Sequence, residues 1–306
     1  MLIGNGKGRQ RVKNPVNLNH IIPRKKMEKT EIVYIVSSDW GCYLFASLHS
    51  LVLSGSKFDS IRIFCVGKKP NSWKFNDSRI IIDEVNSLDD NYFLLNKTYI
   101  SESQAERVVF LDADTLILSP LQQVWEGINA DFIARIASQY QSSKCNLIEW
   151  NNLLSRINAL EVPYFNSGFC VFQNGSHKAL SNFWKELTEK GLKKDLFDPS
   201  EIHGSRFAEQ IALSLAVGSA NLSHQAMKHK QHAFGWQLES YDDAVVYHTS
   251  SKIFFTYATK INHAKSLHLE SSAIANKFNL TQLQLNWNLL KQKVKLKIRP
   301  KLIWDI

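Results

Sequence analysis

The sequence predicts an α/β protein built on a mixed, mostly parallel central β-sheet with helices on both faces. Short apolar runs rich in β-branched and aromatic residues recur along the chain, and segments with helical apolar spacing separate them. Strands that alternate with helices pair in parallel through right-handed crossovers. With 306 residues, 44% of them hydrophobic and 21% charged, the chain can bury a sizeable core, and global disorder is excluded.

The first half of the chain alternates between predicted strands and helices. Predicted strands cover residues 31–36, 61–66, 80–82 and 107–111. A helix is expected over residues 41–54, because apolar side chains recur there at helical spacing, and a less regular one over 91–104. This order indicates successive β-α-β units.

The second half continues the pattern but contains one long irregular stretch. Predicted strands cover residues 130–137, 164–172 and 245–247, and predicted helices cover 120–126, 177–190 and 206–217. Residues 138–162 are polar and lack a clear period, so we expect a long loop there. A loop of that length inside a compact domain is usually functional, often a lid or an acceptor site.

Two acids stand where a short apolar predicted strand ends. The run over residues 107–111 is followed by Asp112, Ala113 and Asp114. Residues i and i+2 of an extended chain point the same way, so both carboxylates can converge on one ion at the carboxyl end of the strand. Asp39 ends the first strand and is expected on the same rim. The alternative is a solvated turn, which the flanking apolar sequence argues against.

The four cysteines and the apolar segments limit the class of protein. The cysteines form no C-x-x-C pair, so buried free thiols are expected rather than a disulfide framework or a zinc site. No apolar stretch approaches the length of a membrane-spanning helix, and no signal-peptide pattern is visible. We expect a soluble, cytoplasmic protein.

The positive charge is concentrated at the two ends of the chain. The formal charge is +9, with +7 in residues 1–30 and +5 in residues 282–306, which leaves the body near −3. Basic tails on a near-neutral body predict peripheral contact with an anionic membrane. The tails have no accompanying aromatic stacking platform, so a nucleic-acid partner is not expected. The predicted organisation is a basic flexible arm (1–29), one domain (30–255) and a C-terminal extension with an alternating basic tail (256–306).

Five sequence pieces, in order, resemble a family of nucleotide-sugar-dependent enzymes. They are residues 34–39 (Tyr-Ile-Val-Ser-Ser-Asp) with Tyr43, residues 109–114 (Val-Phe-Leu-Asp-Ala-Asp), residues 165–168 (Phe-Asn-Ser-Gly), the pair Glu209 and Gln210, and His248. This pattern resembles the family 8 glycosyltransferases, the glycogenin-like and bacterial lipopolysaccharide galactosyltransferase-like group with a GT-A fold. The resemblance covers about residues 31–250.

The resemblance implies a retaining transferase that moves a sugar from a UDP-sugar to an acceptor hydroxyl with Mn²⁺ or Mg²⁺. The implied acceptor is a glycan, a glycolipid or a protein. The implied metal ligands are Asp112, Asp114 and His248, and the implied catalytic residues are Gln210 and Glu209. The expected substrate-binding residues are Ser37, Asp39, Tyr43, Lys97, Asp112, Ala113, Asn166, Ser167, Gly168 and Lys252.

The sequence also departs from the family pattern. After His248 the family usually has Gly and a Lys-Pro-Trp sequence, whereas Thr-Ser-Ser and Lys252 follow here. Glu209 replaces an Asp, Ser138 stands where some members have an Asp, and Lys97 is a loose stand-in for an Arg.

Two other functions fit parts of the pattern. One is a non-catalytic sugar-nucleotide-binding protein of the same fold, which the altered residues after His248 and Glu209 motivate. The other is a haloacid-dehalogenase-type phosphatase with Asp112 as nucleophile. That motif needs Thr or Val at the position of Leu116, and a downstream Gly-Asp-x-x-x-Asp, which is missing.

Overall fold

The computed structural model describes residues 28–71, 73, 75, 77–137, 145–237 and 243–248. Most of the predicted N-terminal arm, Ser138, Lys252 and the predicted C-terminal extension lie outside the described residues. No helix in the described part is long and apolar enough to span a membrane.

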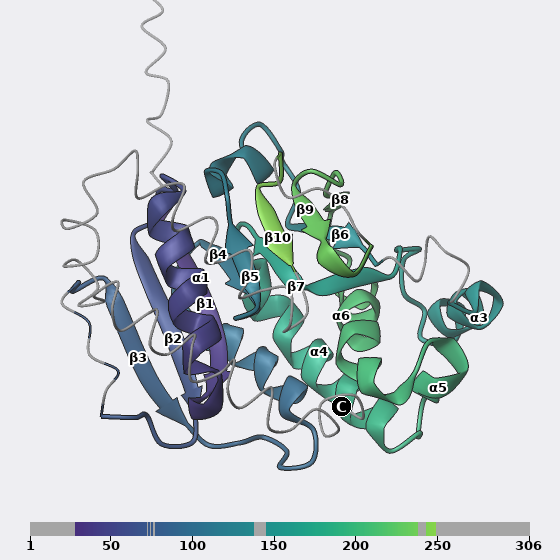
Figure 1. Ribbon diagram of the computed structural model, residues 1–306. Helices are drawn as coiled ribbons and strands as arrows, with labels where there is room; N and C mark the ends of the chain where they lie inside the picture. Colours follow the sequence, from purple (N-terminus) through teal and green to yellow (C-terminus); the bar gives the residue numbers. More distant parts are fainter. Residues whose placement is uncertain are drawn as a thin grey trace, which may run out of the picture.

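A seven-stranded sheet with the order β3-β2-β1-β4-β7-β6-β8 forms the centre of the described chain (Figure 1). Its strands are β1 (Thr30–Ser37), β2 (Ser60–Val66), β3 (Ile80–Val85), β4 (Arg107–Leu111), β6 (Phe132–Ile136), β7 (Phe165–Phe172) and β8 (His224–Ala226). β7 runs antiparallel to both β4 and β6, and the other neighbouring pairs are parallel. The predicted mixed, mostly parallel sheet is therefore confirmed.

A second, three-stranded sheet stands beside the carboxyl end of β4 (Figure 1). Its order is β5-β10-β9, with β5 at Thr115–Ile117, β10 at Val246–His248 and β9 at His232–Phe234. β10 pairs antiparallel with β5 and parallel with β9. Because β5 follows β4 after a short turn, this small sheet brings the last described strand to the Asp112–Asp114 segment.

Helices cover both faces of the large sheet. Successive side chains of a strand point to opposite faces, so a strand can contribute to two buried clusters, one on each face. In β1, Ile32 and Tyr34 belong to one buried cluster, together with side chains of α1 (Gly41–Leu53). Val33 belongs to the other cluster, together with side chains of α4 (Ser176–Leu192) and α6 (Ala208–Ser219). Figure 1 shows α1 over β1, and α4 beside α6.

The prediction of an irregular loop over residues 138–162 is wrong for its described part. The helix α3 (Leu147–Arg156) begins after Asn146, whose side chain accepts a hydrogen bond from the Glu149 backbone N–H at 3.3 Å. Asn at this position caps the first turn of a helix. Trp150 and Leu153 are buried one turn apart, so the helical period was present in the sequence among polar residues that obscured it.

The remaining differences concern short elements. Residues 91–104 hold a 3₁₀ helix, η2 (Phe93–Glu102), and residues 120–126 hold the 3₁₀ turn η3 (Leu121–Val124). A further 3₁₀ turn, η4 (Ser205–Phe207), precedes α6. The strands β5, β8 and β9 and the helix α5 (Pro199–Ile202) were not predicted, because three or four residues are too few to show a period.

The described cysteines match the prediction of buried free thiols. Cys65, Cys145 and Cys170 are free and buried. Burial raises the pKa of the Cys145 thiol to about 11, so this side chain behaves as a small apolar group.

We predict that Trp150→Ala destabilises the fold by about 3–5 kcal/mol, because it removes a fully buried indole and the hydrogen bond from its Nε1 to the Val162 carbonyl. Ile148→Ala in the same helix is the matched control. Ile148 is 77% exposed, so its truncation should change stability by less than about 0.5 kcal/mol. Urea denaturation of both variants measures the difference, and equal effects would contradict the placement of α3.

Candidate active site

Asp112 and Asp114 lie in the tight turn between β4 and β5. The Asp112 backbone N–H donates to the Gly168 carbonyl at 2.8 Å, which ties the turn to β7. The Thr115 hydroxyl and backbone N–H both donate to the Asp112 carbonyl, at 2.7 and 3.1 Å, which closes the turn. Both carboxylates therefore leave the sheet at the carboxyl end of β4, on the rim where open α/β sheets bind ligands.

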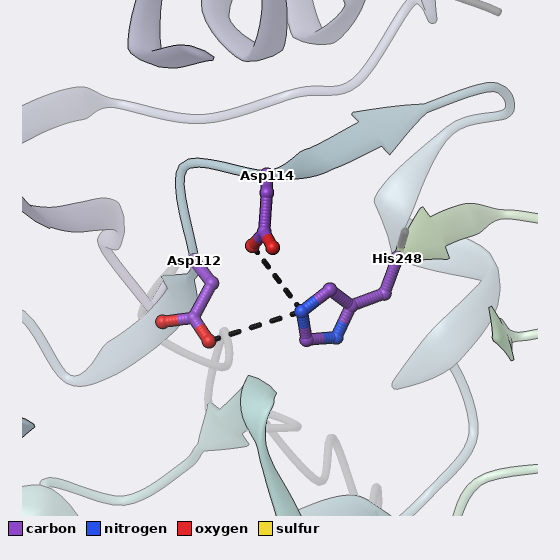
Figure 2. Close-up of side chains that lie close together, drawn as sticks. All are labelled: Asp112, Asp114 and His248. Atoms are coloured by element: carbon purple, nitrogen blue, oxygen red, sulfur yellow. Dashed lines mark ion pairs between the residues drawn. The ribbon is translucent and has the colours of Figure 1, made fainter. Parts of the chain in front are cut away.

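His248 reaches these acids through strand pairing. β10 pairs with β5 so that His248 stands opposite Thr115. The His248 Nε2 atom lies 3.2 Å from Asp114 Oδ1 and 4.0 Å from Asp112 Oδ2, and all three side chains point to one place (Figure 2).

The three side chains fit a divalent cation. One potential ligand atom from each lies within 4.8 Å of the other two. Two carboxylates with one imidazole suit Mn²⁺ better than Ca²⁺, which is a harder ion and prefers oxygen ligands. The side chains of Asp112 and Asp114 are 24% and 23% exposed, so one side of the group stays open to further ligands.

Gly168 makes room for this group. A Cβ atom at this position would lie 2.1 Å from His248 Cε1 and 2.9 Å from Asp112 Oδ2. Real Cβ contacts are not that short, so any larger residue would push His248 and the β4–β5 turn apart. The glycine of the Phe-Asn-Ser-Gly segment is therefore required by the close approach of the His248 and Asp112 side chains.

Lys97, on η2, is a buried cation beside the acids. Its Nζ atom lies 3.0 Å from Asp112 Oδ1, and it donates to Ser167 Oγ at 3.2 Å. It also lies 3.7 Å from Glu209 Oε2. Burial opposes the charge of Lys97, but the carboxylates of Asp112 and Glu209 outweigh it and raise the pKa of the ammonium group. Lys97 therefore remains charged and fixes the orientation of Asp112.

Glu209 is buried in the first turn of α6. One oxygen accepts a hydrogen bond from Ser167 Oγ at 2.9 Å, whereas Oε1 is buried with no hydrogen-bond partner among the described residues. Burial, partly offset by Lys97, raises the pKa of this carboxyl group to about 7. Glu209 can therefore change protonation state near neutral pH.

Asn166 and Gln210 form an amide network that joins β7 to α6. The Asn166 Nδ2 donates to Gln210 Oε1 at 3.0 Å, and the Ser167 backbone N–H donates to the same oxygen at 3.3 Å. The Gln210 Nε2 donates to the Tyr164 hydroxyl at 2.7 Å, and Asn166 Oδ1 accepts from the Gly168 N–H at 3.0 Å. Both ends of the Gln210 amide are thus occupied within the protein.

Four further residues predicted to bind substrate, namely Ser37, Asp39, Tyr43 and Ala113, belong to the end of β1 and to the segments that follow β1 and β4. β1 and β4 are parallel neighbours, so Ser37 at the end of β1 and Asp112 after β4 leave the sheet at the same edge. Asp39 is exposed in the turn η1 (Ser38–Trp40), and Tyr43 is buried in the first turn of α1. Ala113 is buried between the two acids.

No pattern in the sequence pointed to His232, which contacts His248. Its Nε2 atom lies 3.2 Å from His248 Nδ1, and the two rings stack with an interplanar angle of 7°. His232 stands in the three-residue strand β9, and no pattern within such a short strand reveals its partner.

A large cavity lies at the amino ends of β1 and β4, away from Asp112 and Asp114. Its volume is about 830 Å³, and its lining includes Thr30 and Arg107, the first residues of β1 and β4, as well as Trp125 and Gln173. Asp112 and Asp114 follow the other end of β4, so this cavity is separate from the candidate active site.

No family model and no curated protein matches the sequence. The structure is similar to the galactosyltransferase LgtC in complex with donor and acceptor sugar analogues (12% identity, TM-score 0.53, 78% of this chain and 95% of LgtC). It is also similar to the glycosyltransferase GlyE of Streptococcus pneumoniae TIGR4 (12%, 0.53, 78% and 65%) and to the bifunctional glycosyltransferase WbbM (11%, 0.54, 87% and 53%). The protein therefore has the GT-A-type α/β fold of these glycosyltransferases.

We predict that Gly168→Ala destabilises the protein and abolishes Mn²⁺ binding, because the new methyl group would overlap the His248 ring. His248→Ala should lose Mn²⁺ binding but stay folded. The double variant should recover most of the stability lost in Gly168→Ala, because the overlapping ring is gone, without recovering the metal. Thermal unfolding and manganese titration measure both effects, and purely additive destabilisation would contradict the close packing of Gly168 against His248.

We predict that the Glu209 carboxyl group makes the fold less stable as pH rises. Its folded-state pKa of about 7 lies above its ordinary value of 4.5, so the folded state binds the extra proton between these values. This contribution is complete below pH 4.5 and is lost as pH rises through 7. Glu209→Gln should therefore gain stability over the wild type by about 2–3 kcal/mol between pH 5 and 8.

Glu186→Gln is the control for this pH dependence. Glu186 is an exposed carboxylate on α4 that pairs with Lys190, and its loss should leave the pH profile of stability unchanged. Urea denaturation across the pH range measures both variants. A profile for Glu209→Gln that runs parallel to the wild type would show that Glu209 does not titrate in this window.

Proposed function

We propose that this protein is a metal-dependent glycosyltransferase. It transfers the hexose of a UDP-hexose to an acceptor hydroxyl and retains the anomeric configuration. The observation that carries the proposal is the group of Asp112, Asp114 and His248 at the carboxyl end of β4 in a GT-A-type fold. The galactosyltransferase LgtC, with which the fold is shared, holds donor and acceptor sugar analogues.

Asp112, Asp114 and His248 would hold Mn²⁺, or Mg²⁺, which supplies positive charge to a diphosphate leaving group. Asp112 and Asp114 carry two negative charges and Lys97 carries one positive charge at this place. With Glu209 protonated, a divalent cation would leave the rim positive, and a diphosphate would then be attracted to it. Lys252, outside the described residues, is proposed as an additional phosphate contact.

Lys97 and Glu209 have linked roles in this proposal. Lys97 holds Asp112 through an ion pair at 3.0 Å, so that the carboxylate meets the metal in one orientation. Glu209 lies within 3.7 Å of the same ammonium group, and its second oxygen has no partner among the described residues. That oxygen would accept a hydrogen bond from a donor-sugar hydroxyl or stabilise positive charge that develops on the sugar ring.

Asn166, Ser167, Gly168 and Gln210 would form the wall against which the donor sugar lies. The amide network holds Asn166 and Gln210 in one orientation, and a preorganised wall costs no rearrangement during the reaction. Ser37, Asp39, Tyr43 and Ala113 would contact the nucleotide from the neighbouring strand ends. In a retaining transfer with front-face attack, the departing phosphate assists the acceptor, and the protein need not supply a strong nucleophile.

The acceptor is proposed to be a glycan, a glycolipid or a protein. The charge at the two chain ends supports a peripheral contact with an anionic membrane. In the proposed organisation the basic arm precedes, and the basic extension follows, a catalytic domain at residues 30–255 of the sequence. A protein in this role would work on the cytoplasmic face of a membrane.

The second candidate is sugar-nucleotide binding without transfer. It is favoured by the Gln210 amide, whose oxygen already accepts two hydrogen bonds and whose nitrogen donates to Tyr164. An amide committed in this way serves to hold β7 against α6. Transfer of labelled sugar, or hydrolysis of the donor, in a protein that binds UDP-sugars would eliminate this candidate.

We predict that UDP raises the melting temperature of the wild type only when Mn²⁺ is present, because a ligand that binds the folded state stabilises it. Replacing Asp112 and Asp114 together by Asn should abolish this shift, since the amides cannot neutralise the cation. Asp243→Asn, on the exposed pair with Lys230, is the control and should keep the shift. The melting temperatures of the wild type and both variants are measured with a panel of nucleoside diphosphates and nucleoside diphosphate sugars, with and without Mn²⁺. Manganese-dependent UDP binding by the double variant would refute the assignment.

A further inference from the structure

A pair of stacked histidines lies behind the metal-ligand group. His248 presents Nε2 to Asp112 and Asp114, and its other ring nitrogen, Nδ1, lies 3.2 Å from His232 Nε2. His232 is completely buried, and His248 is 7% exposed. His248 Nδ1 therefore faces a side chain that solvent does not reach.

The surrounding structure fixes the position of His232. Phe169 and Phe234 meet its ring edge to face, with centroids 5.4 and 4.8 Å away. Its backbone carbonyl accepts a hydrogen bond from Arg135, a buried side chain of β6, so β9 is held to the large sheet. β9 also pairs directly with β10, which carries His248. The ring thus has little freedom to turn away from His248.

We propose that His232 is a positioning residue that holds His248 in the orientation and tautomer in which Nε2 carries no proton and can bind a metal ion. The inference rests on the proposed metal site, and it assigns a function to a residue outside the three ligands and the donor-binding segments. His232 would act through His248 and would touch neither the metal nor the sugar donor.

The hydrogen-bonding chemistry of imidazole gives the reason. A neutral imidazole carries one proton, so a ring that offers Nε2 to a metal carries its proton on Nδ1. That proton needs an acceptor when it is buried, and His232 Nε2 is at hydrogen-bond distance. Metal-bound histidines commonly donate their second nitrogen to such a partner, which fixes the ring and its tautomer.

The unpartnered nitrogen of His232 supports this role. In that tautomer His232 carries its own proton on Nδ1, and Nδ1 is buried without a hydrogen-bond partner among the described residues. Burial of an unpaired polar group is unfavourable, and phenylalanine would fill the same aromatic surroundings without that cost. The hydrogen bond to His248 is thus the interaction that a histidine provides here and a phenylalanine does not.

The test compares His232→Phe with His177→Phe. His177 is an equally buried histidine with one bonded nitrogen, Nε2 to the Ser103 carbonyl at 3.0 Å, and an unpartnered Nδ1, but it lies in α4. Mn²⁺ affinity is measured without donor by electron paramagnetic resonance of free Mn²⁺. His232→Phe should lower the affinity about 10–100-fold, and His177→Phe should leave it unchanged. His232→Gln, whose amide oxygen can accept the same proton, should recover part of the loss.

Each outcome decides between the hypotheses. If the wild type binds Mn²⁺ and folded His232→Phe binds it equally well, the positioning role is wrong and the metal site stands. If the wild type does not bind Mn²⁺, the metal site and this inference both fail.

A measurement on the unchanged protein covers the case in which His232→Phe does not fold. Long-range ¹H–¹⁵N spectra with Mg²⁺ should show both His248 and His232 protonated on Nδ1 alone. A proton on His232 Nε2 in the Mg²⁺-bound state would overturn the proposal, because that nitrogen would then have nothing to accept.

Discussion

Charge compensation at the carboxyl end of β4 is the constraint on which the rest of the site depends. Asp112, Asp114 and Glu209 bring three carboxyl groups to one rim, and Lys97 is the ammonium group within 4 Å of two of them. Carboxylates gathered in this way repel each other unless protons or cations intervene. The positive charge of Lys97 reduces this repulsion, and so does the raised pKa of Glu209, which favours the neutral carboxyl group. A divalent cation at Asp112, Asp114 and His248 would complete the compensation.

Close packing holds these charged groups together. Gly168 allows the His248 ring and the Asp112 carboxylate to approach the backbone of β7. Asn166 and Gln210 then lock β7 against α6, which carries Glu209. The candidate metal ligands, the Asn166–Gln210 amide network and Glu209 are therefore held by one connected set of contacts, so a substitution at one of them should change the geometry of the others.

The pattern of residues along each strand predicted most of the large sheet. β1, β2, β4, β6 and β7 are buried runs of five to eight residues, and their apolar content stands out locally. α3 was missed because its buried Trp150 and Leu153 stand among asparagines, and β9 because three residues show no period. The tertiary structure decides such elements, since packing against neighbours stabilises segments whose own sequence is ambiguous.

The sequence by itself determined the chemistry of the Asp112–Asp114 pair, because the spacing of two residues after a strand is a local property of an extended chain. It also placed Asn166, Ser167 and Gly168 at the start of a buried strand. Only the tertiary structure decided that Lys97 bonds to Asp112, that His248 meets Asp114, and that His232 supports His248. These contacts join segments that are far apart in the chain. They depend on the pairing of β10 with β5 and β9, and on the space that Gly168 leaves for the His248 ring and the Asp112 carboxylate.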